Sequence, residues 1–247
     1  MPFFSIILAT YNCEKTIKRA IDSILSQDFN DYEIIIIDGG STDNTLAIID
    51  NYESAVFGHR VSEPDSGIYD AWNKGVSAAG GKWIAFLGAD DYFERDALKV
   101  YHKYIEETSV TLEYVSSRVN LVNSSGKITR VIGKLWSWRQ FRTYMCVAHV
   151  GSMHHHSLYQ TYGFYNINYK IVGDYELLLR ANENLKAGYI NYVTANMQVG
   201  GTSNRWYALV EAMKAKIESG KLSRGLALAQ FVVANLKFTV RKLLYES

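Results

Sequence analysis

Short apolar runs and helical repeats alternate four times within the first 107 residues, and this order constrains the fold more than any other feature of the sequence. Runs of branched and aromatic residues predict buried strands, whereas apolar residues spaced three and four apart predict helices. The predicted strands cover 3–9, 33–37, 59–62 and 82–87, and the predicted helices cover 14–26, 45–52, 68–79 and 96–107. Such alternation favours an α/β fold with a mostly parallel sheet covered by helices on both faces.

Polar residues follow three of these predicted strands. They are Thr10-Tyr11-Asn12, Asp38 and the pair Asp90-Asp91. The carboxyl ends of parallel strands lie along one edge of a sheet, where open α/β sheets bind their ligands. Adjacent acids need a positive partner, and Mg²⁺ or Mn²⁺ is held by one or two carboxylates together with substrate phosphates. Capping of the following helix is the competing interpretation of the acid pair.

The pattern changes after residue 107. Residues 112–122 and 127–132 flank an Asn-Ser-Ser-Gly turn, which predicts an antiparallel hairpin added to the sheet. Further strands are predicted at 147–153 and 188–199, and the second leads into a Gly-Gly-Thr-Ser loop suited to closing over a substrate. The aromatic residues of 135–144 are interpreted as packing residues, with a sugar-binding platform as the alternative.

Two groups of polar residues in this second half are candidates for the site. His154-His155-His156 follows a predicted strand, and because neighbours on an extended chain face opposite sides, at most two of the three can share one side. We expect one of them to face a ligand, with a surface or core role as the alternative. Asp174 lies at or near the start of a helix, where the helix dipole stabilises a carboxylate. Capping alone is the alternative role for Asp174.

Two helices, 206–219 and 222–245, are predicted at the end of the chain, with Gly220 between them. The second is rich in apolar residues, contains four basic residues, and has no acid between Lys221 and Tyr245. A basic, apolar helix of this kind can lie at a membrane interface, attracted to anionic lipid. Docking of the helix on its own domain or on a second subunit, as in a homodimer, is the alternative.

Composition excludes several classes of protein. A chain of 247 residues that is 48% hydrophobic suits one large domain with an appendage. The formal net charge of +1 gives no general attraction to nucleic acid. Cys13 and Cys146 form no disulfide framework and no metal cluster, which favours reduced cytosolic thiols. Because residues 1–10 lack the features of a signal peptide and no apolar run could span a bilayer, we expect a cytoplasmic protein, peripheral on the inner face of the membrane if its last helix binds lipid.

Four motifs, taken together, resemble the nucleotide-sugar-binding half of the family 2 glycosyltransferases, which are inverting enzymes of the GT-A fold. The motifs are residues 4–12, 38–45, 65–75 and 87–91, and residues 173–177 look like the acid-rich helix start of the same family. The chain is most similar to the bacterial transferases that build cell-surface polysaccharides. The resemblance covers 3–203. It implies a GT-A (Rossmann-like) catalytic domain at 1–203, with a nucleotide-sugar-binding half at 1–107, an acceptor-binding half at 108–203 and a helical appendage at 204–247.

The resemblance also implies roles in nucleotide binding. In such enzymes the residues that match Thr10-Tyr11-Asn12 line the nucleotide pocket, and the match to Asp38 contacts the base, whose N–H a carboxylate can accept. Asp70 and Lys74 are expected to have supporting roles near the nucleotide. Lys74 could reach a phosphate, or it could be an ordinary surface lysine.

The remaining roles concern the reaction itself. The acid pair of the family holds the metal on the diphosphate, so the resemblance assigns Mn²⁺ or Mg²⁺ to Asp90 and Asp91, with Asp90 also near the nucleotide. Many relatives have an acid where this chain has Gly88, which leaves the main ligand open between the two. The match to Asp174 is the general base that deprotonates the acceptor hydroxyl. His154 or His155 is expected near the acceptor or the diphosphate.

We therefore predict a metal-dependent transferase that moves a sugar from a nucleotide-diphosphate sugar, with a UDP-sugar favoured, to a hydroxyl of a glycan or a lipid-linked glycan. One alternative is a nucleotidyltransferase acting on a sugar phosphate. The loop after the first strand opposes it, because it has no glycine and no basic residue before Lys15. The other alternative is an inactive, transferase-like binding subunit, which the presence of Asp90, Asp91 and Asp174 opposes.

Overall fold

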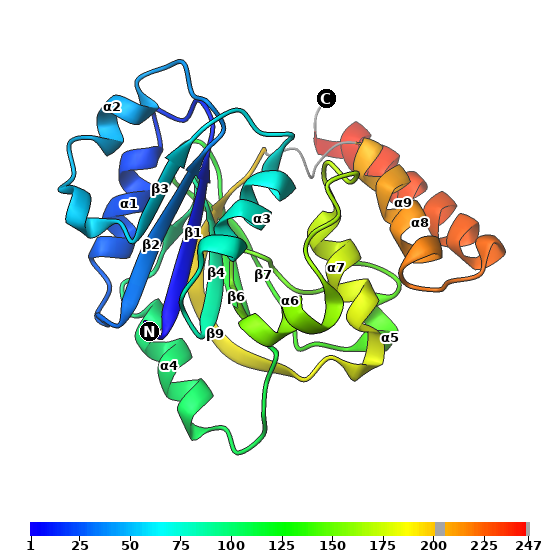
Figure 1. Cartoon of the computed structure of the whole chain (residues 1–247). Coiled ribbons are helices and arrows are strands. Elements are labelled where there is room, and N and C mark those ends of the chain that lie inside the picture. Colours follow the sequence, from blue (N-terminus) through cyan, green and yellow to red (C-terminus); the bar gives the residue numbers. More distant parts are fainter. Residues whose placement is uncertain (201–205, 246–247) are drawn as a thin grey trace.

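In the computed structural model, which describes residues 1–200 and 206–245, nine strands form one mixed sheet (Figure 1). Their order is β3-β2-β1-β4-β8-β6-β9-β5, and β7 pairs with β6. The strands are β1 (Phe4–Thr10), β2 (Tyr32–Asp38), β3 (His59–Ser62), β4 (Trp83–Gly88), β5 (Tyr92–Phe93), β6 (Tyr114–Val122), β7 (Ile128–Ile132), β8 (Ser152–His155) and β9 (Ala187–Gln198).

Helices cover both faces of this sheet and extend beyond one end of it (Figure 1). They are α1 (Ile17–Leu25), α2 (Thr45–Ile49), α3 (Ile68–Ala78), α4 (Ala97–Glu107), α5 (Trp138–Phe141), α6 (His156–Tyr162), α7 (Gly173–Ala181), α8 (Trp206–Glu218) and α9 (Arg224–Tyr245). Two short 3-10 turns lie at Ser54–Val56 and Asn182–Asn184.

The first four strands in the order, β3-β2-β1-β4, are all parallel, as the alternation of the sequence predicted. Their register brings the predicted strand ends together, because Thr10 pairs with Asp38 and Ala9 pairs with Gly88. The polar residues that follow these strands therefore lie along one edge of the sheet. The prediction that these strand ends share one edge is confirmed, and open α/β sheets bind their ligands at such an edge.

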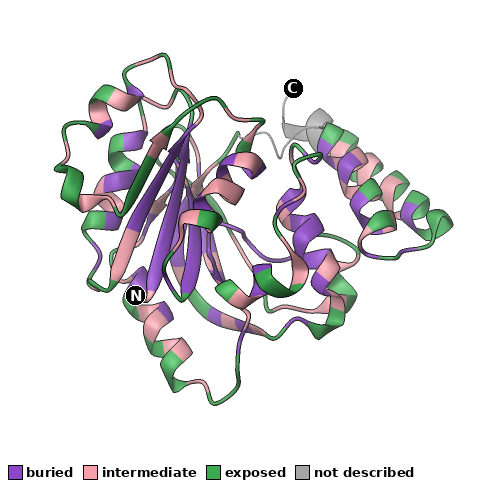
Figure 2. Cartoon of the chain, in the orientation of Figure 1, coloured by how far each residue is buried: buried purple, intermediate pink, exposed green. Residues whose placement is uncertain are grey.

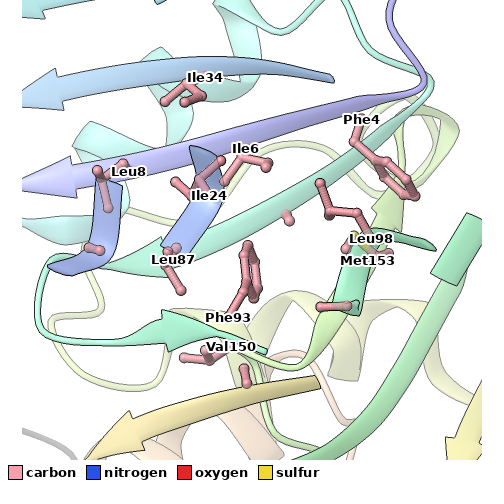
Figure 3. Close-up of a cluster of buried hydrophobic side chains, with 14 of the residues drawn as sticks. Phe4, Ile6, Leu8, Ile24, Ile34, Leu87, Phe93, Leu98, Val150 and Met153 are labelled. Atoms are coloured by element: carbon pink, nitrogen blue, oxygen red, sulfur yellow. The ribbon is translucent and has the colours of Figure 1, made fainter. Parts of the chain in front are cut away.

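Alternating side chains of the central strands fill two separate cores. In β1, Phe4, Ile6 and Leu8 face the side covered by α1 and α4, where Ile24 and Leu98 pack (Figure 3). Ile7 and Ala9 instead face the core formed with α3, α6 and α7. Because a strand presents successive side chains to opposite faces, a strand covered on both sides must be apolar throughout, which explains the unbroken buried run of β1 (Figure 2).

The second half contains the predicted hairpin, because β6 and β7 pair antiparallel. The strand predicted at 147–153 is wrong in position. The paired strand is β8, Ser152–His155, and the preceding segment is buried without strand pairing. The apolar residues of that segment, Ala148 and Val150, fill the core beside β6. Their hydrophobicity therefore indicated correctly that the segment is buried, but it did not indicate a strand. Part of the predicted closing loop, 201–203, lies outside the described residues.

Trp136, Trp138 and Phe141 of the aromatic segment at 135–144 pack as expected, whereas Tyr144 is 47% exposed. Trp136 lies 4.5 Å from Phe141, which is fully buried, and Phe141 lies 4.8 Å from Tyr175 of α7 (ring-centroid distances). These aromatic side chains therefore attach α5 to α7.

The last two helices form a pair beyond α7 (Figure 1). α8 packs on α7, and α9 packs mainly on α8. Ser219, which directly follows α8, donates to Glu176 of α7, and Lys216 of α8 donates to the backbone oxygen of Thr143, which follows α5. Within the described residues, no helix is long and apolar enough to cross a membrane.

Candidate active site

A cavity of about 780 Å³ opens at the carboxyl ends of β1 and β4 and beside the first turn of α3. It is lined by Ala9, Thr10, Tyr11, Asn12, Cys13, Glu14, Lys15, Thr16, Asp43, Asp65, Gly67, Ile68, Ala71, Gly88, Ala89 and Asp90. Its size suits a nucleotide-sized ligand, and its position matches the edge predicted from the strand ends.

The segment after β1 forms one wall of the cavity. Tyr11 is 64% exposed there, so its ring is free to stack on a ligand. Asn12 has a φ of +48°, and its Oδ1 accepts a hydrogen bond from the backbone N–H of Thr42 at 2.8 Å. Asn is among the residues that tolerate this left-handed backbone, and the bond fastens the loop after β2 to the loop after β1. All three predicted residues, Thr10, Tyr11 and Asn12, line the cavity.

Asp38 occupies a different environment from the one expected. It is fully buried and does not line the cavity. Its carboxylate accepts hydrogen bonds from the hydroxyls of Thr10, Ser41 and Ser62 and from the backbone N–H groups of Gly40 and Ser41. Burial disfavours its charged form, but these donors outweigh burial and hold the pKa of Asp38 below its ordinary value. In this structure Asp38 organises the loop, and direct contact with a base stays a prediction.

Asp65 also lines the cavity, and it was not among the site residues predicted from the sequence. Its Oδ1 accepts from the backbone N–H of Gly67 at 2.8 Å. A Cβ atom built on Gly39 would lie 2.6 Å from Oδ2 of Asp65, so the glycine allows the carboxylate to lie against the loop that follows β2. The only available signal was its position in the third motif, at residues 65–75.

The two carboxylates of Asp90 and Asp91 converge over Gly88. A Cβ atom at Gly88 would lie 2.7 Å from Oδ2 of Asp91 and 3.0 Å from Oδ1 of Asp90. Asp90 is exposed and lines the cavity, whereas Asp91 is 6% exposed and its Oδ1 accepts from the backbone N–H of Gln198 at 2.9 Å. The absence of a side chain at Gly88 leaves room for both carboxylates.

This acid pair has the properties of a cation site. Burial, followed by the charge of Asp90, raises the pKa of Asp91 to about 7. Neither carboxylate forms an ion pair among the described residues, and Arg19 donates to the backbone oxygen of Asp90 instead. Across the described residues, no three His, Cys, Asp or Glu side chains are grouped to hold a metal. A divalent ion bound here would therefore need further oxygen ligands from water or phosphate, which is how Mg²⁺ is commonly bound.

Asp174 lies beside the first turn of α3, whose other side lines the cavity. It is half-buried in the first turn of α7 and does not itself line the cavity. Its Oδ1 accepts from the backbone N–H of Tyr175 at 2.9 Å and lies 3.2 Å from the hydroxyl of Tyr69. Burial raises the pKa of Asp174 to about 6, and these two donors limit the increase.

Tyr69 is a second residue that the sequence reasoning missed. Its ring is buried on α3, it stacks on Tyr165, and its hydroxyl also donates to the backbone oxygen of Ile171 at 2.7 Å. A Cβ atom on Gly173 would lie 2.8 Å from this ring, so glycine at 173 allows α7 to approach α3 closely. Tyr69 thus connects α3, which borders the cavity, to Asp174, 105 residues later in the chain.

Glu211 of α8 fixes the segment that leads into Asp174. Its carboxylate accepts from the backbone N–H groups of Lys170, Ile171 and Val172 at 2.8, 2.8 and 3.1 Å. Glu211 is only 7% exposed, so these are buried, charge-assisted hydrogen bonds. The helix after residue 203 is therefore part of the structure that positions Asp174.

Asp70 and Lys74 do not line the cavity. Lys74 forms an ion pair with Glu63 at 2.8 Å and lies 3.7 Å from Asp70 on the same helix. The Asp70 carboxylate also accepts from the backbone N–H of Ser66. These acids already neutralise the ammonium group, and Lys15 is the lysine that lines the cavity.

The expectation that His154 or His155 faces a ligand is not met in this structure. β8 runs antiparallel to β4, and the two histidines pair with Ile84 and Trp83 at the amino end of β4. Four residues of extended chain, about 13 Å, separate that end from Gly88, which lines the cavity. The tract therefore lies at the wrong end of the sheet.

Both histidines have structural contacts instead. His154 is 1% exposed and its Nδ1 lies 2.9 Å from the hydroxyl of Tyr159; burial keeps its pKa well below the ordinary value. Nδ1 of His155 accepts from the backbone N–H of Ser157 and caps α6, and burial lowers its pKa to about 4. A further histidine, His149, is buried and stacked on Trp72 of α3 at 4.4 Å between ring centroids.

The family model described as Glycosyl transferase family 2 matches residues 5–161. A PGL/p-HBAD biosynthesis glycosyltransferase of Mycobacterium bovis (strain BCG / Pasteur 1173P2) is 34% identical over 212 residues, which cover 82% of this chain and 80% of that protein.

Two solved structures resemble the whole fold. S. aureus TarS 1-349 in complex with UDP has a TM-score of 0.69 at 20% identity, and the match covers 98% of this chain and 72% of that one. The mannosyltransferase PcManGT from Pyrobaculum calidifontis, in complex with GDP-Man and Mn²⁺, has a TM-score of 0.67 at 18% identity, covering 97% and 75%. At these identities the structural likeness shows a shared fold.

Proposed function

Because this chain belongs to glycosyl transferase family 2, we propose that it moves a sugar from a nucleotide-diphosphate sugar to an acceptor hydroxyl and inverts the anomeric carbon. The observation that carries the proposal is the arrangement around α3. One side of its first turn lines a cavity that contains Asp90, and the neighbouring residue Tyr69 contacts Asp174.

The donor is a nucleotide-diphosphate sugar, with a UDP-sugar favoured. The exposed ring of Tyr11 offers a stacking surface for a base, and the carboxylate of Asp65 can accept an N–H or a hydroxyl. Lys15 supplies a positive charge on the same cavity. The likeness to TarS, whose structure contains UDP, supports the preference for uridine, whereas PcManGT contains GDP-Man.

Asp90 and Asp91 would hold the divalent cation, Mn²⁺ or Mg²⁺, in this proposal. Their carboxylates converge over Gly88, and neither forms an ion pair within the part of the chain that the structure describes. The buried Asp91 would be ionised more readily beside a metal. When bound, such a metal supplies Lewis-acid stabilisation of the diphosphate that leaves. The family membership and the Mn²⁺ in PcManGT are consistent with this assignment.

Asp174 is the general base in the proposed reaction. The acceptor oxygen forms a bond to the anomeric carbon, the bond from that carbon to the diphosphate oxygen breaks, and the hydroxyl proton passes to the Asp174 carboxylate. The nucleoside diphosphate leaves with the bonding electrons. A pKa of about 6 leaves most of Asp174 ionised at neutral pH, as a base requires.

The acceptor is proposed to be a glycan or a lipid-linked glycan of a surface polysaccharide or glycolipid. The name of the mycobacterial relative supports this class, because that protein is a PGL/p-HBAD biosynthesis glycosyltransferase.

The test is release of nucleoside diphosphate from a panel of UDP- and GDP-sugars with 1 mM Mn²⁺, in the presence of candidate acceptors. We expect Asp174→Asn to lower kcat by at least about 100-fold, because general-base catalysis contributes roughly that factor. The matched control is Asp50→Asn, which changes an exposed acid paired with Arg60 away from the cavity and should retain activity.

Three results would contradict the proposal. The base assignment fails if Asp174→Asn retains full activity. The metal assignment fails if EDTA leaves turnover unchanged or if Asp91→Asn requires no more Mn²⁺ than the wild type. The reaction class fails if the protein releases pyrophosphate from a nucleoside triphosphate and a sugar phosphate but does not turn over any nucleotide sugar.

A further inference from the structure

The outer face of α9 is apolar and exposed. Its inner stripe packs on α8, where Ala227 is fully buried and Phe231 lies 6.4 Å from Trp206 (ring-centroid distance). Six large apolar side chains on the remaining surface are 49–63% exposed: Leu226, Leu228, Val232, Val233, Leu236 and Val240. At 1.5 Å per residue this apolar strip is about 21 Å long. An ordinary surface exposes apolar residues singly and not as a continuous strip.

Basic residues border this strip, with no acid among them. Lys221, Arg224 and Lys237 are exposed, and the sequence continues with Arg241 and Lys242. No Asp or Glu occurs between Lys221 and Tyr245. An apolar helical face bordered by cations matches the two components of a membrane interface that contains anionic lipid, namely acyl chains and negative headgroups.

A second copy of the chain is a poorer partner for this face. Contact between two α9 helices would bring Arg224 and Lys237 of one copy toward the same cations of the other, without an acid on either helix to offset the repulsion.

Trp206 and Tyr207, at the start of α8, are 50% and 56% exposed beside α9. Aromatic side chains of this kind are typical of membrane interfaces.

The contacts of α8 connect this face to the proposed catalytic base. Glu211 of α8 binds the backbone of 170–172, immediately before the helix that starts with Asp174. A bilayer in contact with α9 would therefore be near the acceptor side of the proposed site. We propose that the outer face of α9 docks this protein on the surface of an anionic bilayer, where, if the proposed function holds, it meets a lipid-anchored acceptor.

The test is flotation of the full-length protein with two kinds of vesicle, phosphatidylcholine alone and phosphatidylcholine with 30% phosphatidylglycerol, at 50 and 500 mM NaCl. We expect binding to the anionic vesicles that weakens with salt, because each basic residue near such a surface contributes about fivefold to partitioning. The double variant Val232→Glu/Leu236→Glu should lose at least about tenfold in binding, since it places charge on two exposed apolar positions.

The matched control is Gln140→Glu/Gln160→Glu, which adds the same charge at exposed positions of α5 and α6. The control should float like the wild type. Wild-type protein that stays with the soluble fraction, or an α9 variant that floats equally well, would overturn the proposal. A wild-type dimer that the α9 variant converts to monomer, measured by light scattering, would assign the face to a second copy instead. Hydrolysis of the donor nucleotide sugar, assayed in both variants, separates this result from the proposed function, because α9 lies outside the cavity.

Discussion

The hydrogen bond between Tyr69 and Asp174 gives the sharpest prediction about the site. Tyr69→Phe removes a donor that lies 3.2 Å from Oδ1 of Asp174 and leaves the buried ring in place. This donor favours the charged carboxylate, so its removal raises the pKa of Asp174 further above its ordinary value. Because a base must be ionised, activity should then be lost at a higher pH than in the wild type.

The size of the effect follows from the geometry. The tyrosine hydroxyl has one proton, and the backbone oxygen of Ile171 lies closer to it, at 2.7 Å, than Asp174 does. We therefore assign the bond to Asp174 about 1 kcal/mol, which is below the range of about 1.5–3 kcal/mol for bonds to charged groups because the proton is shared. This corresponds to a rise of about 0.7 in the pKa. If the wild-type midpoint lies near the pKa of about 6, the variant should lose about fivefold in kcat/KM at pH 5 and almost nothing at pH 8.5 from ionisation alone.

The assay is the pH profile of kcat/KM between pH 5 and 9, at a saturating concentration of Mn²⁺ so that the acid pair stays ionised. Tyr175→Phe is the matched control, because its hydroxyl donates to the backbone oxygen of Phe141 at 2.7 Å and does not contact the carboxylate of Asp174. The control should lose comparable stability without moving the midpoint. An unchanged midpoint in Tyr69→Phe, or an equal change in the control, would refute the reasoning.

Two further predictions concern packing and the link to the C-terminal helices. Glu211→Gln should lower the free energy of unfolding, measured in urea, by about 1–3 kcal/mol, because the buried backbone N–H groups before Asp174 lose a charged acceptor. It should lower kcat as well. An unchanged kcat would show that α8 does not position the base. Gly75→Val should lower the free energy of unfolding by about 1–3 kcal/mol, because its Cβ would lie 2.5 Å from Cγ2 of Ile7. Gly225→Ala, at a position with open space around it, should raise that free energy by about 0.5–1 kcal/mol. The reverse order of stabilities in urea unfolding would contradict both expectations.

Local pattern was sufficient for most of the fold. The apolar runs that became β1, β2 and β4 were predicted because a strand covered on both faces has no polar side. The failure at 147–153 has the same origin, since Ala148 and Val150 are buried without strand pairing. An apolar run predicts that a segment is buried. Whether the buried segment is a strand depends on the hydrogen bonds that its backbone forms with neighbouring strands.

The candidate site was predictable where it depended on strand ends and not where it depended on partners. Thr10-Tyr11-Asn12 and Asp90 line the cavity because the end of a parallel strand has one possible location. Asp38 follows the same rule, yet five donors from three separate segments occupy its carboxylate. Lys74 was a candidate for phosphate, and an ion pair with Glu63 holds it elsewhere.

The sequence by itself determined a parallel sheet with acids along its ligand-binding edge, because side-chain periodicity and strand ends are local properties of the chain. Only the tertiary structure decided which of those acids already accept hydrogen bonds from other residues and which face of α9 stays exposed. It also decided that Tyr69 and Glu211 hold the segment around Asp174. These decisions depend on contacts between residues tens of positions apart, and a hydrogen bond or an ion pair exists only once folding has brought its second partner within about 3 Å.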